Sequence, residues 1–118
     1  MKVSMEDMRG AADDASGLLR ALANRHRLLI LCRLVDGERS VGELAAALDI
    51  RDSTVSQHLA LLRKDGLVRT RRDGQTIWYA ISSTPARAVL EALYRSYCGS
   101  AHGRTRRTVA DRRAAPDR

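Results

Sequence analysis

The residues of this chain best suited to chemistry are two cysteines, Cys32 and Cys98, which stand 66 positions apart. The chain has no Cys-x-x-Cys pair, and its N-terminus lacks the apolar segment of a signal peptide, so a cytoplasmic location is expected. Thiols are kept reduced in the cytoplasm, so the two cysteines are expected to be inert or reactive rather than a structural disulfide. The pattern alone favours two small buried apolar side chains, because Cys32 falls on the buried stripe of a predicted helix.

The other residues that could bind metals or catalyse reactions do not gather in the sequence. His26, His58 and His102 are far apart and suggest no metal site. A thiol oxidoreductase would need an exposed cysteine of lowered pKa, usually with a partner close in sequence, and the apolar surroundings of Cys32 argue against one. We therefore expect neither an enzyme nor a cofactor.

A second set of residues suits the recognition of duplex DNA, and it lies on one face of a predicted helix over residues 52–64. At 100° per residue, one side of this helix is apolar and the opposite side is small and polar: Val55, Leu59 and Leu62 face Ser53, Ser56, Gln57, Ala60 and Lys64. Small side chains let a helix enter the ~12 Å major groove, where Ser and Gln can read base edges. An ordinary solvated face is the alternative, but no charged residue lies between Ser53 and Ala60. His58, near the edge of the apolar side, fits a core histidine and a DNA contact equally well.

A basic hairpin is predicted directly after this helix. Two β-like runs, residues 67–72 and 75–81, are joined by Asp73-Gly74, which favours a tight type I′ turn. Three arginines, Arg69, Arg71 and Arg72, lie beside the tip, where cations suit a phosphate backbone or a minor groove. The alternative is a solvated hairpin whose charges protect its edges.

Helical periodicity and capping signals predict the elements that position these residues. Helices are expected over residues 5–22 and 24–35, from a capping box at Ser40-Val41-Gly42-Glu43, over 52–64, and from a Thr84-Pro85 cap to about Cys98. The fold is therefore predicted to be mainly α with a β-hairpin wing. In the order α-α-α-α-β-β-α this is a winged helix-turn-helix, an architecture that grips duplex DNA.

The first predicted helix carries a narrow apolar seam with small residues at its centre. Its members recur at spacings of three and four: Met5, Met8, Ala12, Ala15, Leu19 and Leu22. Such a seam fits packing against the helix's own core and packing across a dimer equally well.

Composition and charge bound the rest. One domain is expected over residues 1–98, with a core of Leu, Ala, Val and Ile, since aromatic residues make up 3% of the chain and Phe is absent. The net charge is +7, of which six arginines and two aspartates in residues 99–118 account for +4, and this basic tail is expected to be disordered. The basic balance indicates a polyanionic partner. No apolar run is long enough for a membrane helix.

The run STVSQHLALLRKDGLVRTRRDGQTIWYAI, within an order of elements that spans residues 15–98, resembles the ArsR/SmtB winged-helix repressors. The resemblance implies a homodimer formed by the first and last helices, which binds near-palindromic operator DNA and leaves it when an effector binds. It places DNA contacts on the recognition helix and on the wing tip. With Lys64 from the polar face, the expected set is Ser53, Thr54, Ser56, Gln57, His58, Lys64, Arg71, Arg72, Asp73, Gly74 and Gln75.

The likeness is weaker to the metal-sensing members, whose third helix carries a cysteine-rich ligand box, because residues 43–48 hold no ligand pair. LLILCRLVDGERSVGEL and EALYRSYC are instead similar to the persulfide-sensing (BigR/SqrR-like) branch. That likeness implies that Cys32 and Cys98 are regulatory thiols, cross-linked by reactive sulfur or oxidation to release DNA, and that no metal is bound. A non-switching repressor or a nucleoid-type DNA-binding protein with structural cysteines is the alternative.

Overall fold

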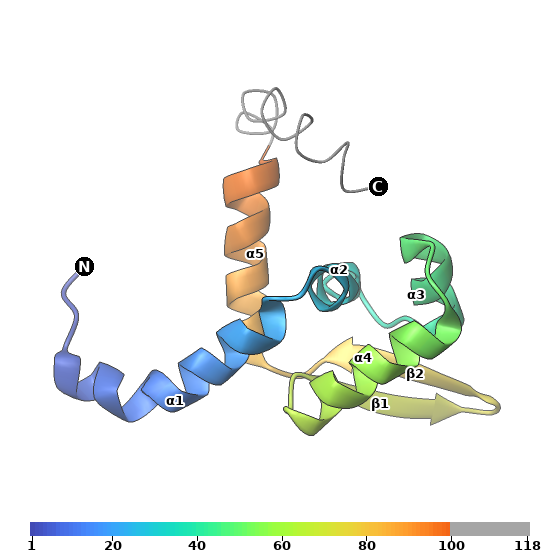
Figure 1. Cartoon of the computed structure of the whole chain (residues 1–118), viewed down its shortest axis with the longest axis horizontal. Coiled ribbons are helices and arrows are strands. Elements are labelled where there is room, and N and C mark those ends of the chain that lie inside the picture. Colours follow the sequence, from blue (N-terminus) through green and yellow to red (C-terminus); the bar gives the residue numbers. More distant parts are fainter. Residues whose placement is uncertain (100–118) are drawn as a thin grey trace.

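A computed structural model describes residues 1–99, which form five helices and one two-stranded hairpin (Figure 1). In chain order these are α1 (Met5–Leu22), α2 (Arg25–Leu34), α3 (Val41–Leu48), α4 (Asp52–Lys64), β1 (Val68–Asp73), β2 (Thr76–Ile81) and α5 (Thr84–Cys98). The order confirms the predicted winged helix-turn-helix. The predicted basic tail lies outside the described residues, apart from Gly99.

Local capping signals explain where the helices begin. The Asn24 side chain accepts a hydrogen bond from the Arg27 amide at 3.0 Å, and both bonds of the predicted capping box between Ser40 and Glu43 are present at 3.2 Å. The predicted cap of α5 is wrong by one residue. Ser83 caps α5 by accepting from the Ala86 amide at 3.1 Å, and Thr84 is the first residue inside the helix.

The hairpin is confirmed, but its turn differs from the predicted one. Asp73 pairs with Thr76 in the antiparallel ladder, so the two turn residues are Gly74 and Gln75 rather than Asp73 and Gly74. Gly74 has a φ of 63°, and Gln75 is not among the described residues with positive φ. A positive φ at the first central position alone is typical of type II′, whereas type I′ requires it at both.

The core is centred on α2, which packs against α1, α3, α4 and β2. Ile30 and Leu31 are 0% exposed and Leu34 is 1% exposed. The predicted apolar face of α4 is also fully buried, and the core closes with side chains from α3, the hairpin and the first half of α5. These contacts make one body of α2, α3, α4 and the wing.

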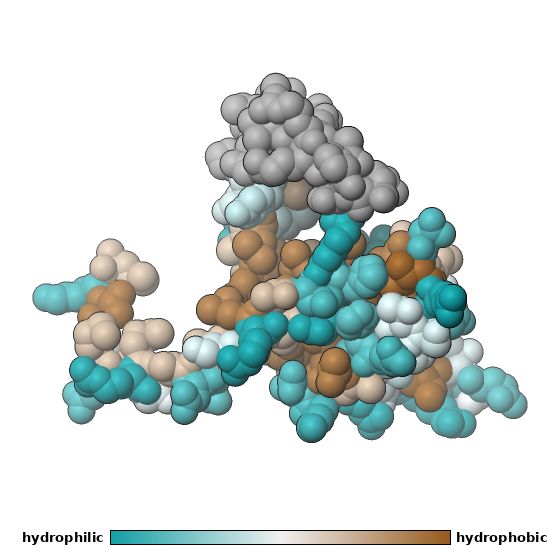
Figure 2. Space-filling view, in the orientation of Figure 1, coloured by the Kyte–Doolittle hydropathy of each residue, from teal (hydrophilic) through white to brown (hydrophobic). Residues whose placement is uncertain are grey.

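Most of α1 extends away from this body, and α5 stands beside it (Figure 1). Only Ala21 and Leu22 of α1 are buried, while Met5, Met8 and Leu19 of the predicted seam are 63%, 43% and 57% exposed. Figure 2 shows apolar surface along α5 and at the outer end of α1. None of the helices among residues 1–99 combines the length and the apolar character that crossing a membrane requires.

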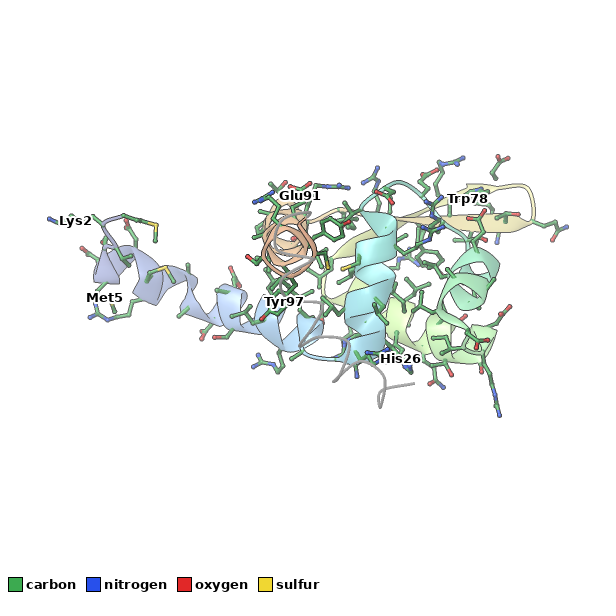
Figure 3. The ribbon with its side chains drawn as sticks, turned by 90° about the horizontal axis from the view of Figure 1, so that it is seen from above. Lys2, Met5, His26, Trp78, Glu91 and Tyr97 are labelled. Atoms are coloured by element: carbon green, nitrogen blue, oxygen red, sulfur yellow. The ribbon has the colours of Figure 1, made fainter. Side chains whose placement is uncertain are left out.

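His58 of α4 contacts His26 of α2, whose position at one end of α2 is labelled in Figure 3. The ring centroids are 5.6 Å apart with an interplanar angle of 67°. The Nδ1 atom of His58 is buried and has no hydrogen-bond partner among residues 1–99. Burial lowers the pKa of His58, and the neighbouring Arg27 and His26 lower it further. The neutral imidazole is therefore the form that fits this interface.

This contact predicts a pH dependence of stability. The folded-state pKa of His58 is depressed below its unfolded value of about 6.5, so its contribution to the free energy of unfolding is present above that pH and is lost as pH falls through the folded pKa. We expect urea unfolding at pH 7.5 and 5.5 to show a larger loss of stability in the wild type than in His58→Gln. An equal loss in both proteins would contradict the assignment.

Candidate nucleic-acid interface and thiol site

The outer face of α4 is determined by the burial of its inner face. Because Val55, Leu59 and Leu62 are fully buried, the opposite side of the helix must face solvent. The predicted polar residues are all exposed there: Ser53, Ser56, Gln57, Ala60 and Lys64. Thr54 and His58 are half-buried at the flanks of this face. The structure thus brings the predicted helix residues onto one small, polar, accessible surface.

A groove of about 440 Å³ continues this surface toward β2. Its lining comes from the second half of α4 and from the hairpin: Ser56, Leu59, Ala60, Arg63, Lys64 and Tyr79. Arg63 and Tyr79 were not predicted as site residues. Helical spacing could have identified Arg63, since Ser56, Ala60 and Arg63 stand at i, i+4 and i+7. Nothing local in the sequence places Tyr79 beside α4.

The predicted wing-tip residues, Arg71 to Gln75, are all exposed. Side chains alternate along a strand, so Arg71 and Arg72 leave β1 on opposite faces. The Arg72 side chain makes no hydrogen bond or ion pair within residues 1–99, whereas Arg69 donates from Nη1 to the carbonyl of Ile81 at 3.1 Å. The arginines of the wing therefore differ in their hydrogen bonds, although they form one cluster in the sequence.

Arg71 is engaged by Glu38, a residue that the sequence did not single out. Arg71 Nη2 donates to Glu38 Oε1 at 2.7 Å and Arg71 Nε donates to Glu38 Oε2 at 3.0 Å. The hydrogen bond from Arg71 lowers the pKa of Glu38, so the carboxylate stays ionised near neutral pH. The two residues stand 33 positions apart, and no periodicity could have paired them.

The two thiols lie on the central helix α2 and at the end of α5. Cys32 is half-buried on α2 and packs against core residues, while Cys98 is exposed at the last residue of α5. Burial raises the pKa of Cys32, and the nearby charge of Cys98 raises it further. Cys32 is thus mainly a thiol at neutral pH, and Cys98 is the more accessible of the two. Within residues 1–99, no three His, Cys, Asp or Glu side chains are grouped so that they could hold a metal ion.

Comparison with known proteins finds one matching family and several similar regulatory proteins. The profile of the family described as "Bacterial regulatory protein, arsR family" matches residues 24–70. The chain is 49% identical over 96 residues to the transcriptional activator HlyU of Vibrio cholerae, covering 81% of this chain and 89% of that protein. It is 42% identical over 97 residues to the biofilm growth-associated repressor of Agrobacterium fabrum, covering 82% of this chain and 83% of that protein.

Solved structures agree with the sequence comparisons. The fold is similar to the crystal structure of the transcriptional repressor BigR from Xylella fastidiosa, with a TM-score of 0.77 and 40% identity over 81% of this chain and 98% of that one. The family profile covers the helix-turn-helix and ends inside β1, and the similarity in sequence and in fold extends over about four fifths of the chain. This chain therefore belongs to the arsR family of bacterial regulatory proteins and is a winged-helix transcriptional regulator.

Proposed function

We propose that this protein is a homodimeric repressor that leaves its operator when Cys32 and Cys98 are cross-linked by reactive sulfur. The observation that carries the proposal is the separation of two sets of residues: α4, with its exposed polar face, and the wing lie on one side of α2 (Figure 1), whereas the thiols are on α2 and at the end of α5. Of the relatives compared above, two are named as repressors and HlyU as an activator; repression is part of the proposal.

In this proposal α4 enters the major groove of duplex DNA. Ser53, Ser56 and Gln57 meet base edges, since they are exposed on the small polar face that allows close approach. Thr54, His58 and Lys64 lie at its margins, where phosphates pass. The wing tip adds phosphate or minor-groove contacts through Arg71, Arg72, Asp73, Gly74 and Gln75.

A second copy of the chain is proposed to cover α1 and α5. Most helical stability in proteins comes from the packing of an apolar face, and within its own chain α1 buries only Ala21 and Leu22, with Leu18 packed against the core. A groove of about 810 Å³ between α1, the end of α4 and the start of α5 offers further apolar surface, including Leu18, Leu61 and Val89. Two recognition helices related by a dimer axis would read half-sites ~34 Å apart.

The proposed effector chemistry is thiol exchange with an organic trisulfide or a related polysulfide. The exposed Cys98 thiolate attacks the central sulfur of R–S–S–S–R and expels one R–S⁻. Cys32 then loses its proton to solvent and attacks the transferred sulfur, which expels the second R–S⁻. The products are Cys98–S–S–S–Cys32 and two R–SH, so the sulfane reagent is reduced as the two thiols are oxidised.

An inserted sulfur also suggests a basis for selectivity. A plain disulfide requires Cα atoms roughly 5.5–6 Å apart, and a longer sulfur bridge spans a larger gap with less strain. The cross-link joins core helix α2 to α5, which would tilt one protomer against the other and change the half-site spacing. A coupling of about 1–3 kcal/mol is enough to weaken binding 5- to 150-fold.

A repressor with structural cysteines is the second candidate, and one observation favours it. The raised pKa of Cys32 disfavours the thiolate that reacts with sulfur. A nucleoid-type role would instead rest on the basic residues 99–118, whose attraction for phosphate is independent of sequence. A salt titration on a selected and on a random duplex separates these roles, because a repressor has a large specificity ratio.

Substitutions on α4 should separate base reading from phosphate contact. On a duplex selected from a random library by the wild type, Gln57→Ala should cost about 1–3 kcal/mol and relax preference at one base pair. Lys64→Gln should weaken binding to all duplexes and reduce the slope of log K against log salt by about 0.9. Fluorescence anisotropy measures both. Equal loss on selected and random duplexes with Gln57→Ala would contradict base reading.

Substitution of either cysteine should uncouple DNA binding from sulfur. Trisulfide treatment should weaken wild-type binding at least about fivefold and join the peptides of Cys32 and Cys98 in mass spectrometry. Cys32→Ser and Cys98→Ser should bind DNA as the reduced wild type does, before and after treatment. Release of treated Cys32→Ser from DNA would rule out the cross-link as the switch.

Charge placed on α1 should break the proposed dimer. Leu19→Glu introduces a carboxylate at an exposed seam position, and sedimentation velocity should show a shift toward monomer together with weaker operator binding. Ile77→Glu is the matched control for sedimentation, since Ile77 is an exposed apolar residue of β2, next to the tip of the wing and outside both proposed dimer helices. The proposed interface is wrong if Leu19→Glu remains as dimeric as the control.

A further inference from the structure

The loop that joins α2 to α3, residues 36–39, is bonded to both strands of the wing. The Arg39 amide donates to the carbonyl of Tyr79 at 3.1 Å, and the Tyr79 amide donates to the carbonyl of Arg39 at 2.8 Å. The Gly37 amide donates to the carbonyl of Leu34 at 3.1 Å, which ties the loop to the end of α2. The loop thus pairs with β2 through one antiparallel bridge, beside the two strands of the wing.

Glu38 extends this attachment to β1 through its paired hydrogen bonds with Arg71. The carboxylate meets Nε and Nη2 of the guanidinium at 3.0 and 2.7 Å, a two-point contact that determines the orientation of the planar group. Arg69, on the same face of β1, adds to the positive field around Glu38. Nη1 of Arg71 is left on the side of the wing tip, 3.9 Å from Asp73 Oδ2.

This arrangement matters because the Arg71 side chain is 53% exposed on a two-stranded hairpin. A long side chain there would otherwise sample many rotamers and lose that freedom on binding DNA. An exposed ion pair contributes little to the stability of a fold. Stabilisation of the fold therefore does not explain the two-point contact between Glu38 and Arg71.

We propose that Glu38 is a positioning residue for DNA binding, which orients the Arg71 guanidinium and holds the wing to the end of α2. The inference rests on the proposed binding of DNA by α4 and the wing. A positioning role and simple charge repulsion predict opposite effects of neutralising Glu38. Repulsion between the carboxylate and DNA predicts tighter binding, whereas a positioning role predicts weaker binding.

The test compares wild type, Glu38→Gln, Arg71→Gln and the double variant on a duplex that the wild type selects from a random library, over a range of salt. Glu38→Gln should weaken binding on the order of three- to tenfold in the wild-type background. In the Arg71→Gln background the same change should not weaken binding, because no guanidinium remains to be oriented. Arg71→Gln should lower the salt slope by about 0.9, as expected for a lost phosphate contact.

Two further variants separate position from charge. Asp36→Asn removes the same charge from the same loop and should not weaken binding, because the exposed Asp36 side chain makes no hydrogen bond or ion pair within residues 1–99. Glu38→Asp keeps the charge but shortens the side chain, so it should bind as weakly as Glu38→Gln. Thermal unfolding of each variant tests whether the fold is intact. The pKa of Glu38, followed by NMR, tests the contact and should rise in Arg71→Gln.

The outcomes are distinct. If the wild type selects no duplex, the proposed DNA-binding function falls, and the inference with it. If the wild type binds but Glu38→Gln binds equally well or more tightly, or loses the same factor in the Arg71→Gln background, Glu38 has no positioning role and only the inference is overturned.

Discussion

Burial of the apolar stripe of α2 is the constraint on which the rest of this structure depends. Ile30, Leu31 and Leu34 are almost completely inaccessible, and α1, α3, α4 and β2 all pack on this helix. Packing against α2 leaves the polar face of α4 turned outward. The same helix carries Cys32 on its flank and continues into the loop that holds the wing. The proposed DNA-binding surface of α4 and the wing, and the thiol of Cys32, are therefore all positioned by α2.

The outer helices α1 and α5 are less buried within the chain than α2. α1 contributes only its last turn to the core, and only Ala86 and Leu90 of α5 are buried. Figure 3 shows α5 end-on, with Glu91 and Tyr97 on opposite sides and Met5 far out along α1. None of the first 16 residues is buried, so most of α1 lacks the tertiary packing that supplies most of the stability of helices in proteins.

Features with a local cause were predictable from the sequence, and features made by tertiary contact were not. The faces of α4, the capping box at Ser40 and the helix order follow from spacing over a few residues. The contact of Glu38 with Arg71 joins residues 33 positions apart, and the proximity of Cys98 to Cys32 was implied by the family resemblance and by no spacing in the sequence. The turn was misplaced because Asp-Gly and Gly-Gln both suit tight hairpins, and strand register decides between them.

The attachment of α5 gives it the mechanics of a lever. Arg87 Nη1 donates to the carbonyl of Val35 at 3.1 Å, and beyond Leu90 no residue of α5 is buried. The helix is therefore held to the core near its first turn, and Cys98 lies ~16 Å further along its axis. A displacement of about 2 Å at the thiol end would rotate the helix by roughly 7° about this attachment. In the proposed switch, a small chemical change at the thiol end would thus become an angular change of the whole helix.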